Sequence, residues 1–177
     1  YQEGNFIEQS NKKSFELLEK ACNNGDQEAM YLFAEALRKG TICDQDLNRA
    51  AFLHKKNSEN GNIDSIYLYA KMLEKGEGVE KDIEKAAQNF KLAADCEKSE
   101  AIIRYSEMLM NGEGVEKNIN ESYIYLNKAV EKGNPEALYK MGLKLINNNS
   151  LQNRNKAKEY FKKAALKNHV ASEYYYG

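Results

Sequence analysis

The sequence predicts an all-α fold, a solenoid of antiparallel helix hairpins that repeats every 36 residues. Small residues recur at this spacing, at Ala29, Ser65, Ala101 and Ala137. A leucine column recurs at the same spacing, at Leu37, Leu73, Leu109 and Leu145. A fixed period of roughly 20–50 residues is typical of solenoids, in which each repeat buries its apolar face only against its neighbours.

The period predicts one solenoid domain over residues 1–177. We number its complete repeats 1 to 4, and they span residues 25–60, 61–96, 97–132 and 133–167. Partial repeats flank them at 1–24 and 168–177, and Gly4, 36 residues before Gly40, predicts the end of a first helix. Because neither end shows the polar capping repeat that solenoids need for solubility, we expect the chain to be a piece of a longer array.

An apolar stripe predicts the first helix of each repeat, because residues 3, 4 and 7 apart share one helix face. The stripe residues are Met30, Phe33, Ala34 and Leu37; Ile66, Tyr69, Ala70 and Leu73; Ile102, Tyr105, Ser106 and Leu109; and Leu138, Met141, Gly142 and Leu145. One column holds only small residues, at Ala34, Ala70, Ser106, Gly142 and Gly177. A uniformly small column predicts that two helix backbones approach closely there.

Glycine predicts where the first helix ends, because it adopts the left-handed conformation that terminates helices. Gly40, Gly76 and Gly112 hold this position. Asn148 replaces them in repeat 4, where the loop 147–153 is one residue shorter. The residues placed to cap the second helices are Asp46, Asp82 and Asn118, with Glu121 completing a capping box.

The second helices carry large and small residues in register, which predicts that neighbouring helices interdigitate. The small columns are Ala50, Ala86, Ser122 and Ala157, and Asn57, Ala93, Ala129 and Ala164. The large column between them is His54, Phe90, Leu126 and Phe161.

Charge and hydropathy argue against two classes of partner. Lys and Arg number 26 against 27 Asp and Glu, so the net charge of −1 creates no field that would gather a phosphate backbone or anionic lipid. No apolar run approaches the roughly 20 residues that span a bilayer. We therefore expect no nucleic acid partner and no membrane insertion by this segment.

The three cysteines, Cys22, Cys43 and Cys96, fall at different positions of the repeat, whereas a disulfide framework should recur with it. We therefore expect free thiols, which favour a reducing compartment and a cytoplasmic location. Because the chain starts at Tyr1 rather than Met, a trimmed signal or an ER-lumenal parent protein stays open.

The loop and second helix of repeat 2 carry a specific motif, in which Gly76-Glu77-Gly78-Val79-Glu80-Lys81-Asp82 precedes Ala86, Phe90, Ala93 and Ala94. Repeat 3 nearly matches it, with Gly112-Glu113-Gly114-Val115, Ala129 and Gly133. With the columns of the first helix, this order resembles the Sel-one-like repeat (SLR) family of the tetratricopeptide-like superfamily over essentially the whole chain. The resemblance implies a right-handed superhelix of α-hairpins and a role as adaptor or scaffold. Repeat 1 departs from the pattern at Ile42 and Cys43, and repeat 4 lacks both loop glycines.

No motif predicts catalysis. The Gly-x-Gly turn at Gly76 follows a helix and carries Glu77, which would repel phosphate, so a structural turn is favoured. His54 has no second ligand at metal-binding spacing, which favours a half-buried, hydrogen-bonded core histidine. Cys43 stands in a valine column and is expected to act as a small apolar side chain. We predict a protein that is not an enzyme and holds no cofactor and no metal.

The family resemblance supplies one weaker enzymatic alternative. Cysteine-rich relatives have been associated with β-lactam binding or hydrolysis, and they resemble one another in a cysteine pair in each repeat. No repeat of this chain holds such a pair, and no nucleophile has an adjacent base in the sequence.

In an α-hairpin array the first helices line the concave side, so residues opposite the buried stripe face the groove. We expect eight of them to bind a protein or an extended peptide: Tyr31, Tyr67, Ile103, Tyr139, Arg38, Lys71, Glu107 and Met110. Tyrosine at these positions also suits packing against the next hairpin, and this alternative stays open. The predicted function is a non-catalytic protein-protein interaction scaffold or adaptor, and the alternative is a structural spacer between other domains of a larger protein.

Overall fold

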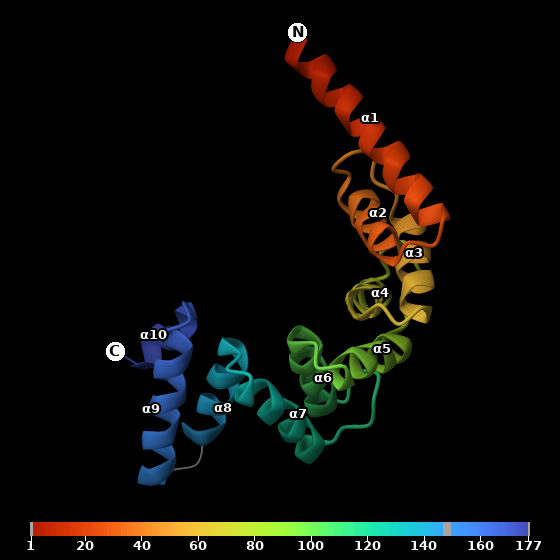
Figure 1. Cartoon of the computed structure of the whole chain (residues 1–177). Coiled ribbons are helices and arrows are strands. Elements are labelled where there is room, and N and C mark those ends of the chain that lie inside the picture. Colours follow the sequence, from red (N-terminus) through yellow and green to blue (C-terminus); the bar gives the residue numbers. More distant parts are fainter. Residues whose placement is uncertain (1, 147–149, 177) are drawn as a thin grey trace. The chain divides into compact units, whose positions relative to one another are not determined.

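The computed structural model describes residues 2–146 and 150–176, and ten helices cover most of them (Figure 1). The helices are α1 (Gln2–Asn23), α2 (Gln27–Lys39), α3 (Leu47–Glu59), α4 (Ile63–Lys75), α5 (Ile83–Asp95), α6 (Ser99–Asn111), α7 (Ile119–Glu131), α8 (Pro135–Ile146), α9 (Leu151–Ala165) and α10 (Val170–Tyr176). These residue ranges contain no strand. The predicted all-α class is therefore confirmed.

The chain forms two compact bodies, which we name the N-terminal body (Tyr1–Ala93) and the C-terminal body (Ala94–Gly177) and describe separately. In the N-terminal body, α1 packs on α2, α2 on α3 and α3 on α4. In the C-terminal body, α6 packs on α7, α7 on α8, α8 on α9 and α9 on α10. Each of these contacts joins helices that follow one another along the chain, as in a solenoid. The single domain over residues 1–177 stays a prediction.

Each complete repeat is one pair of helices: α2 and α3, α4 and α5, α6 and α7, and α8 and α9. The large and small columns of the second helices form the core, and every member is at most 1% exposed. The stripe of the first helices is buried too, except that Tyr69 and Leu145 are half-buried. The fold is thus a solenoid of helix hairpins, built by the residues that carry the 36-residue period.

The loops within repeats 1 to 3 begin and close in the same way, although the second left-handed residue occurs only at Gly78 and Gly114 of repeats 2 and 3 and not at Ile42 of repeat 1. Their first helices end in left-handed glycines, with φ of 66° at Gly40, 75° at Gly76 and 78° at Gly112. One backbone hydrogen bond then closes each loop, from Asp46 N to Leu37 O (3.0 Å), Asp82 N to Leu73 O (2.9 Å) and Asn118 N to Leu109 O (2.8 Å). This bond ties the start of the second helix to the end of the first.

The surroundings of Gly78 explain why the second residue of the Gly-x-Gly turn is glycine. Its φ is 68°, and a β-carbon on it would lie 2.0 Å from the carbonyl oxygen of Leu47, the first residue of α3. The obstacle is backbone at the start of a helix, which cannot rotate away as a side chain can. The turn is therefore structural, as predicted.

The predicted caps of the second helices are confirmed. The side chains of Asp46, Asp82 and Asn118 accept hydrogen bonds from the backbone N–H three residues later, at 2.9, 2.9 and 3.1 Å. Glu121 does not complete the usual capping box, because it accepts from the side-chain amide of Asn118 (3.0 Å) and not from its backbone N–H. That N–H already donates to Leu109.

Two predicted helix ends are wrong. Gly4 lies inside α1 and does not end a helix; glycine is tolerated in a helix at a cost of about 1 kcal/mol, and no second glycine follows it as Gly78 follows Gly76. In repeat 4, α9 begins at Leu151, ahead of the predicted loop end at Asn153. Ser150 supplies the extended backbone from which this helix starts. Asn148 and Gly177 lie outside the described residues.

Candidate functional site

The eight residues predicted to bind a partner all lie on first helices, and we call them the first-helix face. In the N-terminal body they are Tyr31 and Arg38 on α2 and Tyr67 and Lys71 on α4. In the C-terminal body they are Ile103, Glu107 and Met110 on α6 and Tyr139 on α8. Every one is half-buried, so each side chain presents part of its surface to solvent.

The tyrosines of the first-helix face pack against the large second-helix residue of their own repeat. The ring centroids are 6.0 Å apart for Tyr31 and His54, 5.8 Å for Tyr67 and Phe90, and 5.9 Å for Tyr139 and Phe161. Tyr139 also contacts His169 (4.8 Å) and Tyr175 (6.0 Å) of the following partial repeat. Each ring is therefore held in place by its own hairpin, and Tyr139 packs on the next one as well.

Charged residues of the N-terminal body are held by their neighbours on the same helix. Glu35 accepts hydrogen bonds from Arg38 Nε (2.5 Å) and Nη2 (3.0 Å), and Lys39 Nζ lies 2.7 Å away. Burial alone would raise the pKa of Glu35, but these bonds outweigh it and lower the pKa to about 2. Lys71 Nζ lies over the Tyr67 ring, 5.5 Å from its centroid. Arg38 is thus held beside the carboxylate of Glu35, and Lys71 lies over the ring of Tyr67.

In the C-terminal body a network of carboxylates and basic side chains runs along α6 and α8 and ends at His169. Its links are Glu113 to Arg104 (2.6 Å), Arg104 to Glu107 (3.2 Å), Glu107 to Lys140 (2.8 Å), Lys140 to Glu136 (3.2 Å) and Glu136 to His169 (2.8 Å). Burial alone would raise the pKa of Glu136, but hydrogen bonds from His169 and Lys140 lower it. Glu107 of the first-helix face is therefore part of a network that joins the first helices of repeats 3 and 4.

His54 is a core histidine, as predicted, but it is fully buried and not half-buried. Its Nδ1 lies 3.4 Å from Ser65 Oγ, and Asn57 Nδ2 donates to the same oxygen (3.0 Å) and to Gln27 O (2.9 Å). Burial lowers the pKa of His54 to about 4, against the carboxylate of Glu35, whose Oε1 lies 3.6 Å from Nε2. The imidazole is therefore neutral at pH 7 and belongs to a buried polar cluster between α3 and α4.

A hollow of about 250 Å³ opens on the first-helix face of the C-terminal body. Its lining comes from three helices: Ser106, Glu107 and Met110 of α6, Tyr123 and Leu126 of α7, and Lys140, Leu143 and Lys144 of α8. The structure thus brings Glu107 and Met110, two of the predicted binding residues, into one site. The other six predicted residues do not line it.

The sequence contains a signal for this hollow that column-by-column comparison could have found. Leu126 stands where repeats 2 and 4 have Phe90 and Phe161, so the large column is one ring short in repeat 3. The prediction missed Tyr123 and Lys144, because it considered only one face of the first helices.

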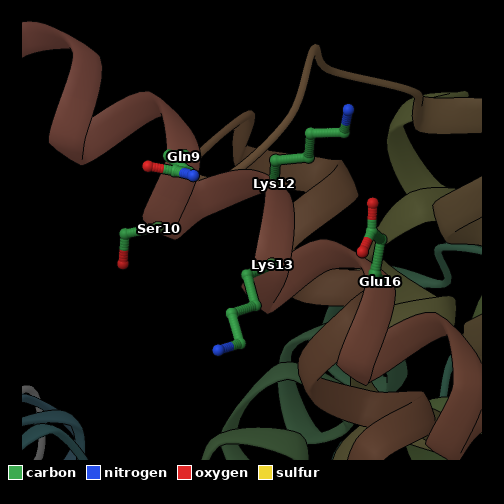
Figure 2. A pocket seen from close by; sticks show the side chains of 5 residues that line it. All are labelled: Gln9, Ser10, Lys12, Lys13 and Glu16. Carbon is green, nitrogen blue, oxygen red and sulfur yellow. The ribbon is translucent and has the colours of Figure 1, made fainter.

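A larger hollow, about 540 Å³, lies along α1. Its described lining residues, Gln9, Ser10, Lys12, Lys13 and Glu16, all belong to this one helix. Figure 2 shows Lys12 and Lys13 extending away from one another. Because these side chains do not converge, they lack the arrangement of polar groups that marks a ligand site.

Two of the three thiols, those of Cys22 and Cys43, are disfavoured as reactive thiolates. All three are free: Cys22 is buried, Cys43 half-buried and Cys96 exposed. Burial raises the pKa of Cys22 and of Cys43, which disfavours the reactive thiolate. Cys43 packs against the core of repeat 1, as Val79 does, in agreement with its predicted apolar role.

Neither a group of metal-ligating side chains nor a membrane-spanning helix occurs in the part of the chain that the structure describes. No three His, Cys, Asp or Glu side chains among these residues are grouped as a metal site would require. None of the described helices combines the length and the apolar character needed to cross a membrane.

Solved structures of repeat proteins share this fold. A Sel1 repeat protein from Oxalobacter formigenes is 24% identical with a TM-score of 0.81, over 92% of this chain and 66% of that one. A protective antigen present in uropathogenic Escherichia coli strains, displaying an SLR fold, is 23% identical with a TM-score of 0.81, over 92% and 35%. Cysteine rich protein B of Helicobacter pylori is 21% identical with a TM-score of 0.57, over 73% and 93%. At these identities the likeness shows the fold alone, and the chain spans less than two thirds of the first two proteins.

No curated protein matches the chain significantly. The family model described as plant tetratrico peptide repeats matches residues 114–177. The Sel1 repeat matches three consecutive segments, residues 1–26, 27–62 and 63–97, which together cover more than half of the sequence. This chain therefore belongs to the Sel1 repeat family.

Proposed function

We propose that the chain is a non-catalytic scaffold or adaptor module, which binds a protein or an extended peptide on its first-helix face. The observation that carries the proposal is the half-buried state of all eight face residues. A side chain that is anchored by its own hairpin and still partly open loses little entropy when it contacts a partner. Tyr31, Tyr67 and Tyr139 are anchored in this way by their ring contacts.

The face residues differ from repeat to repeat, which supports a specific partner over a ligand that binds every repeat alike. The small core column at Ala34, Ala70, Ser106 and Gly142 stays small in every repeat, whereas the column six residues after the opening small residue reads Glu35, Lys71, Glu107 and Leu143. Within each body this column changes in charge or polarity from one repeat to the next, from Glu35 to Lys71 in the N-terminal body and from Glu107 to Leu143 in the C-terminal body, which fits a ligand with matching charges and apolar groups. The family gives general support, because Sel1 and tetratricopeptide-like repeats commonly act as protein-interaction scaffolds.

Peptide selection tests this proposal without a known partner. The full chain would be immobilised and presented with a phage-displayed library of random dodecapeptides, and the enriched peptides would be synthesised. We expect each of them to bind at least tenfold more weakly to one of two face variants, Lys71→Ala in the N-terminal body or Met110→Ala in the C-terminal body, as measured by fluorescence anisotropy.

The matched controls are Lys91→Ala on α5 and Ile124→Ala on α7, because both side chains are exposed on second helices away from the face. Their peptide affinities should equal that of the unmodified chain. Failure to enrich any peptide, or equal losses in face and control variants, would overturn the proposed function.

A further inference from the structure

We infer that the hollow between α6, α7 and α8 receives an apolar side chain of a partner peptide, next to an acidic side chain that pairs with Lys144. This inference rests on the proposed function and assigns one ligand chemistry to one part of the first-helix face.

The lining of the hollow includes Leu126, an aliphatic residue in a column that is otherwise aromatic. Leu126 is 1% exposed and occupies the column in which repeats 2 and 4 have phenylalanine. Ile103, which does not itself line the hollow, replaces the tyrosine that the other repeats have in its column. Where Tyr67 packs on Phe90 in repeat 2, repeat 3 thus has two aliphatic side chains. The missing aromatic volume is consistent with a hollow in this repeat.

The walls suit one side chain of a peptide better than a small molecule. The volume of about 250 Å³ lies below the range of about 300–1,000 Å³ that is usual for small-molecule sites. Met110 and Leu143 are half-buried on opposite helices, α6 and α8. Methionine adapts to apolar groups of different shape, so this wall can accept several kinds of side chain.

The two lysines at the hollow are in different electrostatic states. The positive charge of Lys140 is paired with two carboxylates, those of Glu107 at 2.8 Å and Glu136 at 3.2 Å. The ammonium of Lys144 lies over the Tyr123 ring, 3.0 Å from the centroid, and no described carboxylate pairs with it. The side chain of Lys144 is exposed, and its contact with the lining of the hollow lowers its pKa through partial desolvation. An acidic group of a partner would supply the missing counter-charge.

The position of Lys144 in the repeat shows that this charge is specific to repeat 4. The same column holds Ala36, Met72 and Met108 in repeats 1 to 3, and all three are buried. A lysine at a position that is otherwise apolar and buried is not needed for the hairpin. Together with the apolar side chain of Leu126, it favours an acidic and apolar segment over a basic one, which Lys144 would repel.

The dodecapeptide selection described above tests this inference when it is run on three forms of the chain: unmodified, Leu126→Phe and Lys144→Glu. Leu126→Phe restores the residue of repeats 2 and 4, so it fills the hollow with a side chain that the fold already accepts. We expect the unmodified chain to enrich peptides with Asp or Glu within three residues of Leu, Met or Phe. Leu126→Phe should weaken their binding at least tenfold, and Lys144→Glu should enrich Lys or Arg peptides instead.

The matched control is Lys128→Glu, since Lys128 also lies over a tyrosine ring, 4.9 Å from the centroid of Tyr125, but does not line the hollow. It should leave the acidic peptides bound. Thermal melting checks that Leu126→Phe is folded, and the charge reversal at Lys144 decides the matter if it is not.

The outcomes separate the two proposals. Peptides that lose affinity with Lys71→Ala but not with Leu126→Phe or Lys144→Glu would overturn this inference and leave the proposed function standing, whereas no enrichment would overturn both. A chain that self-associates until Leu126→Phe makes it monomeric would show that a second copy fills the hollow, which also overturns the inference.

Discussion

Gly142 on α8 faces the ring of Phe161 on α9 so closely that a β-carbon on Gly142 would lie 2.6 Å from Cε1 of that ring. Phe161 is 1% exposed, so its ring is enclosed by the protein. The corresponding residues of repeats 1 to 3 are Ala34, Ala70 and Ser106, so repeat 4 is the one whose first helix requires glycine here. The predicted small column thus reflects a contact between helices.

Gly142→Ala should destabilise the C-terminal body, because the added methyl group overlaps a buried ring. We expect a loss of about 1–3 kcal/mol in the free energy of unfolding, as is typical of overpacked cores. Urea unfolding measures it. Adding Phe161→Leu should make the double variant more stable than the sum of the single effects predicts; strictly additive effects would contradict the proposed contact.

Gly78→Ala should be more damaging than a glycine substitution that changes only the backbone preference. Gly61 has a φ of 84° and nothing within 4 Å of the place a β-carbon would take, whereas Gly78 meets the Leu47 backbone. Gly61→Ala should therefore cost about 1–2 kcal/mol for the left-handed conformation alone. Gly78→Ala adds a shift of the α3 start and should lower the melting temperature distinctly further. Equal melting temperatures of the two variants would show that the contact is unimportant.

Acid should destabilise the N-terminal body through His54. Because its pKa falls from 6.5 to about 4 on folding, the unfolded chain binds more protons between these values, and stability is lost as the pH falls through this range. The loss reaches about 3 kcal/mol near pH 4. The contribution of Glu35 is lost as the pH falls from 4.5 to about 2, because folding lowers its pKa between these values. Denaturant unfolding at a series of pH values measures the slope.

The control for this pH dependence is the triple variant His54→Phe, Asn57→Ala and Ser65→Ala. It introduces the residues that repeat 2 and the start of repeat 3 have at these positions, Phe90, Ala93 and Ala101. Its stability between pH 6.5 and 4 should change much less than that of the unmodified chain. An unaltered slope would mean that another group is responsible.

Glu97→Gly should stabilise the chain. Glu97 has a φ of 64°, in a column where Gly25, Gly61 and Gly133 have the same left-handed backbone. Glycine removes this strain. The side chain of Glu97 is exposed, so loss of its ion pair with Lys132 (2.8 Å) destabilises the fold only slightly. Differential scanning calorimetry should show a rise in melting temperature of about 2 °C, and a fall would indicate that the Lys132 contact outweighs the strain.

The repeat pattern was sufficient to predict the helices, the loop glycines and the caps Asp46, Asp82 and Asn118, because each depends on residues close in sequence. The first-helix caps could have been found in the same way. Asp26, Asn62 and Asn134 accept from the backbone N–H three residues later, at 2.8, 2.9 and 3.1 Å. They form a column at the period of the repeat, except in repeat 3, where Lys98 makes no such bond.

The sequence by itself determined the hairpins, their core columns and the half-open face, since a 36-residue period places each apolar side chain against the same neighbour in every repeat. Only the tertiary structure decided that His54 shares a buried cluster with Ser65, that Lys140 bridges Glu107 and Glu136, and that Lys144 is left over the Tyr123 ring without a described carboxylate. These relationships depend on how side chains from separate helices meet in space. The distance between such side chains is set by packing, and a one-dimensional period does not contain it.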